Sequence, residues 1–180
     1  MKLFKNICLL IFAIITILFT VGYASQPIVN SSSTISTPSG SVSSVSDKTF
    51  YISYYSTTLS DIQNTYTQNT DYTSLSNNEK IVFQTLFYIC IAITILLTVS
   101  IILALLGLKL VSKIVFLLVL IMMIVAFLVI QLSILTKSLV VMADTQSLSK
   151  PDVSNGTGYY LILASTVLML VNYILYMFLA

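Results

Sequence analysis

The sequence predicts an all-α membrane protein, a four-helix transmembrane bundle, with a small β-hairpin in the first extracellular loop as a further feature. The first observation is composition: of 180 residues, 57% are hydrophobic and only 8% are charged, against roughly 25% charged residues in soluble domains. The second is that no charge occurs between Lys80 and Lys109 or between Lys113 and Lys137. Uncharged runs of this length exceed the ~18 apolar residues that indicate a membrane span. The third is an alternating, strand-like stretch within the long polar region.

Four apolar segments are expected to be the spans, at residues 7–24, 81–108, 114–136 and 159–180. Each is long enough to cross a ~30 Å hydrocarbon layer at ~1.5 Å per residue. In lipid a backbone must satisfy its own hydrogen bonds, so these segments should be helices. The remaining regions are an N-terminus at 1–6, a first outer loop at 25–80, an inner turn at 109–113 and a second outer loop at 137–158.

The placement of lysine predicts the orientation. Lys2 and Lys5 precede the first span, and Lys109 and Lys113 lie between the second and third, whereas all six acidic residues fall in the other two loops. Cytoplasmic segments are enriched in lysine. We therefore expect an integral protein of the plasma membrane or an endomembrane, with both termini in the cytoplasm.

The first span has a rival interpretation as a cleaved signal peptide. Met1–Lys5 is basic, residues 7–21 are apolar, and Gly22-Tyr23-Ala24 is a small-x-small cleavage pattern. Cleavage would leave three spans. The apolar region lies at the long end of the usual ~7–15 residues, which favours retention.

The first outer loop divides into two parts. Residues 31–46 contain eleven Ser or Thr, and this composition predicts a disordered or sugar-coated segment. Thr49–Leu59 alternates as a strand does, residues 60–64 suit a turn, and residues 64–72 suit a returning strand. The alternative is a short helix capped by Ser60 and Asp61.

Polar residues within the spans are candidate packing contacts. Asn172, Thr94 and Thr98 are expected at a similar depth, and Gln84 and Gln131 near the outer surface. An amide in hydrocarbon needs partners, which neighbouring helices supply. Packing is therefore favoured over a ligand or ion site.

Two N-glycosylation sequons occur, Asn30-Ser31-Ser32 and Asn155-Gly156-Thr157. Both fall in loops assigned to the outside. Asn155 lies beside the fourth span, so Asn30 is expected to be the better acceptor.

No arrangement of residues indicates catalysis, a cofactor or a metal. The chain has no His, no metal-ligand spacing and no Gly-rich phosphate loop. No span contains an ionisable residue, which argues against a pump or a proton-coupled transporter. The net charge of +2, without a basic cluster, argues against binding nucleic acid.

The layout of a long first outer loop, a very short inner turn, a short second outer loop and a last span entered through Gly156-Thr157-Gly158-Tyr159-Tyr160 resembles the claudin-like four-span superfamily, including its fungal cortical-patch members. The resemblance is architectural. That family's first outer loop usually carries a Trp and a pair of cysteines that staple a small sheet, and this chain has neither in its outer loops. No functional residue is therefore transferred.

We expect a non-enzymatic surface protein that organises the membrane or its partners. Its contacts would be the lipid bilayer and protein partners or a second copy, through the transmembrane helices and the outer loop. The alternatives are a channel or transporter subunit and a signal-cleaved, three-span surface or viral-envelope protein.

Overall fold

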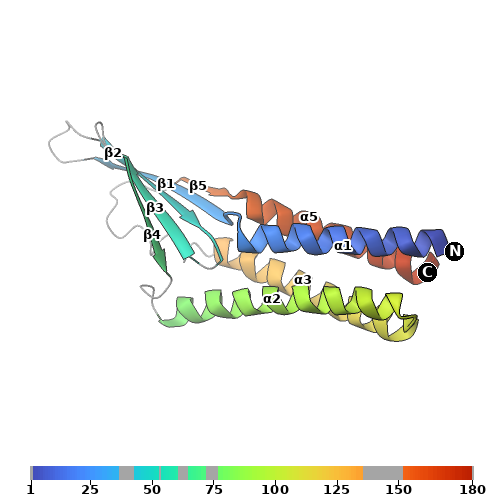
Figure 1. The fold of residues 1–180 in the computed structure, drawn as a ribbon. Coiled ribbons are helices and arrows are strands. Elements are labelled where there is room, and N and C mark those ends of the chain that lie inside the picture. The colour runs from blue at the N-terminus through green and yellow to red at the C-terminus, as the bar shows by residue number, and fades with distance from the viewer. Residues whose placement is uncertain are drawn as a thin grey trace.

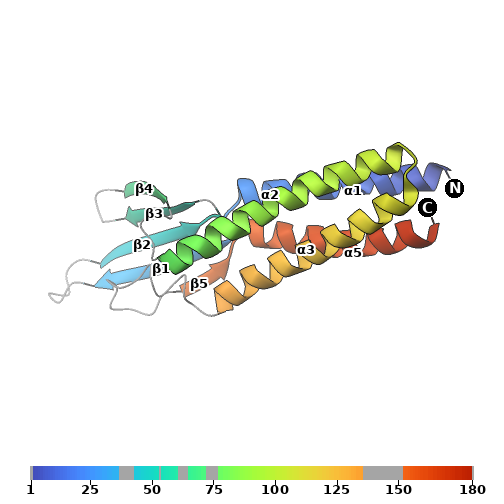
Figure 2. The ribbon, with the colours of Figure 1, turned by 90° about the horizontal axis from the view of Figure 1, so that it is seen from below.

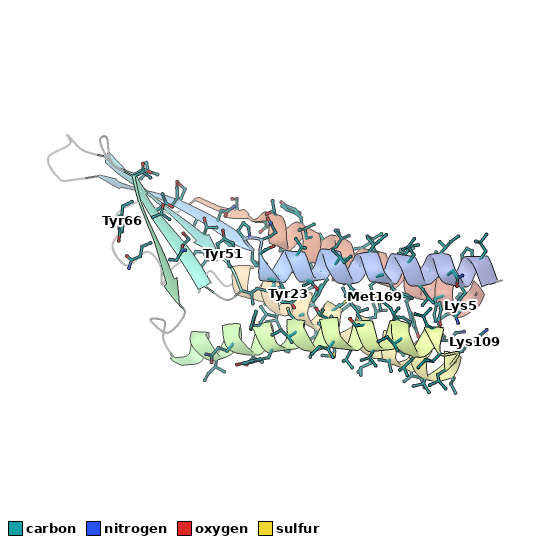
Figure 3. All side chains as sticks on the ribbon, viewed as in Figure 1. Lys5, Tyr23, Tyr51, Tyr66, Lys109 and Met169 are labelled. Atoms are coloured by element: carbon teal, nitrogen blue, oxygen red, sulfur yellow. The ribbon has the colours of Figure 1, made fainter. Side chains whose placement is uncertain are left out.

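The computed structural model describes residues 2–36, 43–52, 54–60, 65–71, 77–135 and 152–179. Long helices run together, and a β-sheet extends from one end of them (Figure 1). Both termini lie at the opposite end, where Lys5 and Lys109 are also found (Figure 3). We call these the sheet end and the lysine end of the bundle.

Among the described residues, four helices form the bundle: α1 (Lys2–Ala24), α2 (Asn77–Leu105), α3 (Lys109–Leu135) and α5 (Thr157–Leu179). All four contain apolar stretches of 22 to 24 residues that are long enough to cross a membrane. Their outward faces carry large apolar side chains, such as Leu10 and Leu110, which are 63% and 73% exposed. Such faces suit contact with lipid. The chain is a multi-pass membrane protein, and the predicted fold class is confirmed.

The helices pack as two pairs, α1 with α5 and α2 with α3, and the pairs meet through α1–α2 and α3–α5 contacts (Figure 2). The side chains between them are fully buried, among them Phe12, Phe19, Met123 and Met169. Aromatic and flexible sulfur-containing side chains fill the interior together, which lets helices with few polar groups interlock.

The inner turn is shorter than predicted. α2 ends at Leu105 and α3 begins at Lys109, so the expected turn at 109–113 is wrong: these residues form the first turn of α3. The amide of Leu108 donates to Leu103 O (3.0 Å) and that of Gly107 to Ala104 O (3.3 Å). With Gly107 at φ +86°, this is a Schellman motif, in which a left-handed glycine terminates the helix.

The sheet has five antiparallel strands in the order β4-β3-β2-β1-β5. The first four form a meander within the first loop, and β5 comes from the second loop and pairs with β1. Their bounds are β1 (Val29–Ser36), β2 (Ser43–Phe50), β3 (Tyr54–Ser60), β4 (Thr65–Asp71) and β5 (Asp152–Asn155). The two loops therefore build one structure.

The predicted hairpin is present as β3 and β4, with Ser60 opposite Thr65. The chain from Thr65 is thus a strand and not the alternative helix. The expectation of one strand over Thr49–Leu59 is wrong, because β2 ends at Phe50 and β3 begins at Tyr54. The apolar–polar alternation of the sequence continues through the connection between β2 and β3, because Ile52 in that connection is buried, at 1% exposure. No Gly or Pro marks a turn there.

Disorder over residues 31–46 is also wrong where the structure describes them. Residues 31–36 belong to β1 and 43–46 to β2, while 37–42 lie outside the described residues. Ser and Thr were interpreted as unable to bury a core, but a strand between two others needs only ladder hydrogen bonds and modest side-chain packing.

Candidate functional site

The sheet joins the bundle through two connections, α1–β1 and β5–α5, which lie against each other. The amide of Gly156 donates to Ile28 O and that of Gly158 to Pro27 O, both at 2.8 Å. A Cβ added at Gly158 would lie 2.5 Å from Gly22 O. The backbones therefore touch, as only glycine permits here. We call Gly22, Gly156 and Gly158 the glycine junction.

This junction fixes the direction in which both loops leave the membrane. α1 leads into β1 within a few residues, β5 leads into α5 through Gly156, and β1 pairs with β5. The hydroxyl of Thr157 adds a bond to Gln26 Oε1, at 2.9 Å. Strand pairing and the junction restrain the same two segments, so β1 and β5 are tied together where they join α1 and α5.

The two faces of the sheet differ at the end nearest the bundle. Val29 lies opposite both Phe50 and Asn155, and directly opposite residues share a face. Val29 and Phe50 are 1% and 2% exposed, so this face is buried there. The other face carries a row of polar residues that crosses all five strands: Ser154, Asn30, Thr49, Ser56 and Asn69.

The two sequons therefore lie on opposite faces. Asn30 belongs to the polar row, whereas Asn155 shares a face with Val29 and Phe50. A sugar on Asn30 would extend over polar side chains, and one on Asn155 would begin beside the glycine junction.

In the order of the described strands, β4 forms one edge of the sheet. Its side chains from Thr65 to Asn69 are all exposed, and Tyr66, at 62% exposure, lies far from the helices (Figure 3). An edge strand offers backbone donors and acceptors as well as side chains to a partner. The polar face and β4 thus form the accessible surface of the sheet.

Within the bundle, the predicted polar residues join different helix pairs. The Thr94 hydroxyl lies 3.3 Å from that of Thr20 and 3.4 Å from that of Tyr23, linking α2 to α1. Gln131 Oε1 accepts from the Tyr159 hydroxyl at 2.6 Å, linking α3 to α5.

Two other candidates do not make such links. Thr98 is exposed and donates to Thr94 O of its own helix, at 2.9 Å. Gln84 is exposed as well, while Gln131 has Tyr159 as its partner.

Asn172 is buried, at 2% exposure, but not at the predicted depth. Its Nδ2 donates to Cys8 O at 2.9 Å, and Cys8 lies twelve residues before Thr20, or ~18 Å along α1. Thr94, which contacts Thr20, is therefore at another level. The expectation of a common depth failed because the helices are shifted along one another within the bundle, so equal distances from helix ends are not equal depths.

The amide oxygen Asn172 Oδ1 has no hydrogen-bond partner within the described part of the chain. Asn172→Leu removes one interhelical bond, worth ~0.6 kcal/mol on average, and also removes a buried oxygen that lacks a donor. We expect the free energy of unfolding, measured by thermal unfolding in detergent, to change by less than about 1 kcal/mol. Asn172→Asp should be clearly less stable, because a carboxylate costs far more than an amide to bury within a membrane-spanning bundle. A large loss in Asn172→Leu would show that this amide has a further partner.

Among the described residues, no group of three His, Cys, Asp or Glu side chains is placed to hold a metal ion. Both cysteines, Cys8 and Cys90, are buried free thiols. Comparisons with protein-family models and with curated protein sequences find no match for this chain.

Sequence reasoning missed the glycine junction. Gly22 was interpreted only as part of a cleavage pattern, and Gly156 and Gly158 only as the entry to a helix. The spacing Gly-x-Gly directly before an apolar span was the available signal, since glycine at such a place permits close backbone approach.

Proposed function

We propose that this chain is a non-enzymatic four-span surface protein that organises the membrane or its protein partners through its outer sheet and lateral helix contacts. The observation that carries the proposal is the glycine junction, because it holds a largely polar, five-stranded surface in a fixed orientation beyond the bundle. Enzymes need convergent reactive groups in a cleft, whereas this proposal rests on the surface of a sheet and on contacts between helices.

The proposed orientation places both termini in the cytoplasm of a cell whose plasma membrane or endomembrane holds the protein. Lys5, Lys109 and Lys113 lie towards one end, and Asp47 and Asp71 are in the sheet at the other. The lysine asymmetry supports this direction. A glycan at Asn30 belongs to the same proposal.

Membership of the claudin-like superfamily is also a proposal. It is supported by a sheet that occupies the first outer loop, as that resemblance implies. Here, however, no Trp or disulfide holds the sheet. The pairing of β5 with β1 and the glycine junction take that part.

One observation favours the alternative of a channel or transporter subunit, namely that the buried Asn172 Oδ1 has no hydrogen-bond partner among the described residues. The signal-cleaved alternative has less support, because α1 contributes Phe12, Ile15 and Phe19 to the core. We therefore propose that α1 is retained.

The test uses single cysteines, since Cys8 and Cys90 are buried. On intact cells, an impermeant maleimide should modify Gln68→Cys on β4 and spare Lys109→Cys, which is exposed in the first turn of α3 at the lysine end. An impermeant maleimide that carries a photoreactive group should then join Gln68→Cys to a partner or a second copy in defined adducts. Modification of Lys109→Cys would contradict the proposed orientation. Efficient labelling of Gln68→Cys without any adduct would contradict the organising role of the sheet.

A further inference from the structure

The lysine end of the bundle carries positive charge without acidic side chains. Lys2, Lys5, Lys109 and Lys113 belong to helix segments at this end. No Asp or Glu occurs in residues 2–24, 80–135 or 157–179 of the sequence. The acidic residue Glu79 stands in the first turn of α2, at its other end, so these helix segments supply no carboxylate side chain to the lysine end.

Two of these lysines are held by the ends of other helices. Lys5 Nζ donates to Ala104 O of α2 at 2.6 Å, and Lys113 Nζ donates to Met177 O of α5 at 3.2 Å. Lys113 Nζ also lies over the Tyr176 ring, 5.8 Å from its centroid. The last carbonyls of a helix lack intrahelical partners and carry the negative end of its dipole, so they attract ammonium groups.

These bonds position the ammonium groups without using all their donors. An ammonium group has three N–H donors, and the bond to a helix-end carbonyl uses one. Within the part of the chain that the structure describes, two donors remain on each of Lys5 and Lys113, close to the end of a membrane-spanning segment. Lys109 is exposed at the same end.

We propose that the lysine end binds the headgroup phosphates of anionic phospholipids in the leaflet that it faces. Charge complementarity favours this partner: the end is positive, and a zwitterionic headgroup would bring its own cation. Lysines beside a membrane attract anionic lipid over short distances, and salt weakens that attraction. The inference depends on the bundle crossing the membrane and on neither the proposed function nor the proposed orientation.

The experiment measures the affinity of the purified full chain, in neutral detergent, for phosphatidylglycerol and for phosphatidylcholine by native mass spectrometry. The wild type should favour phosphatidylglycerol, and added salt should reduce that preference. Lys5→Gln/Lys109→Gln/Lys113→Gln should lower the affinity ratio roughly five-fold for each lysine removed. Lys109→Gln alone leaves both helix-end bonds in place and should still lower the ratio roughly five-fold.

The matched control, Lys48→Gln/Lys80→Gln/Lys150→Gln, removes the same charge from positions outside the lysine end and should leave the ratio unchanged. Equal affinity of the wild type for both lipids would overturn the proposal. An equal fall of the affinity ratio in the control variant would also overturn it. So would inorganic phosphate protecting the protein against thermal unfolding as well as phosphatidylglycerol does, because a free anion would then be the ligand.

Discussion

Gly158→Ala should lower the stability of the protein by more than about 2 kcal/mol, although alanine normally favours a helix over glycine by ~1 kcal/mol. The added Cβ would lie 2.5 Å from Gly22 O, 2.8 Å from Gln26 O and 2.9 Å from Pro27 O. All three atoms belong to backbone, so relief requires the α1–β1 connection to move away from α5. That movement would also lengthen the bond from the Gly158 amide to Pro27 O. Thermal unfolding in detergent should shift downward by roughly 4–8 °C or more.

Gly107→Ala is the matched control for this change. Gly107 has φ +86°, and an added Cβ would meet nothing within 4 Å. Its cost is the strain of a left-handed alanine, ~1–2 kcal/mol, without any displacement of neighbouring backbone. Hydrogen exchange distinguishes the two variants: only Gly158→Ala should lose protection at the β1–β5 ladder. If Gly158→Ala keeps that protection and its full stability, the sheet is not fixed by the glycine junction.

The sequence was sufficient for the helices because a single physical requirement determines them. Long uncharged apolar runs in lipid must satisfy their own backbone groups, so four runs predict four helices. The first helix begins earlier than expected, at Lys2, because lysines at a helix end can extend towards the interface while their backbone continues the helix. The inner connection is shorter than expected because Gly107, at φ +86°, ends α2 within a single residue.

The sheet was only partly predictable because its strands depend on contacts between distant segments. The β3–β4 hairpin joins neighbours, and its alternation was visible. β1 is rich in serine, and β5 has only four residues, so neither has a strong local pattern. They form strands because the glycine junction aligns them and each completes the other's hydrogen-bond ladder.

The intramembrane contacts required knowledge of how far each helix is shifted along the bundle. Asn172 is buried, but its partner is the Cys8 carbonyl rather than a threonine side chain. Thr98 faces outward even though Thr94, one helical turn earlier, faces α1. Depth and facing direction depend on helix stagger and rotation, which packing determines and hydropathy does not.

Phe12→Ala should also destabilise the bundle strongly. Phe12 is fully buried, stacks on Phe116 with ring centroids 3.9 Å apart, and meets Tyr176 edge-on at 5.7 Å. These three rings join α1, α3 and α5. In a soluble core the loss would be ~3–5 kcal/mol. Between lipid-embedded helices no transfer from water contributes, so the lost packing and ring contacts leave about 2–3 kcal/mol.

Leu10→Ala on the same helix is the control, because Leu10 is 63% exposed on the lipid-facing side and should cost little. Thermal unfolding of both variants in detergent, together with the mass of the mature N-terminus, also tests whether α1 is retained. A large loss confined to Phe12→Ala requires α1 to be present in the folded protein. If the mature chain begins after Ala24, neither substitution remains in it and both variants must match the wild type. In that event the three-span alternative would replace the four-helix bundle as the mature form.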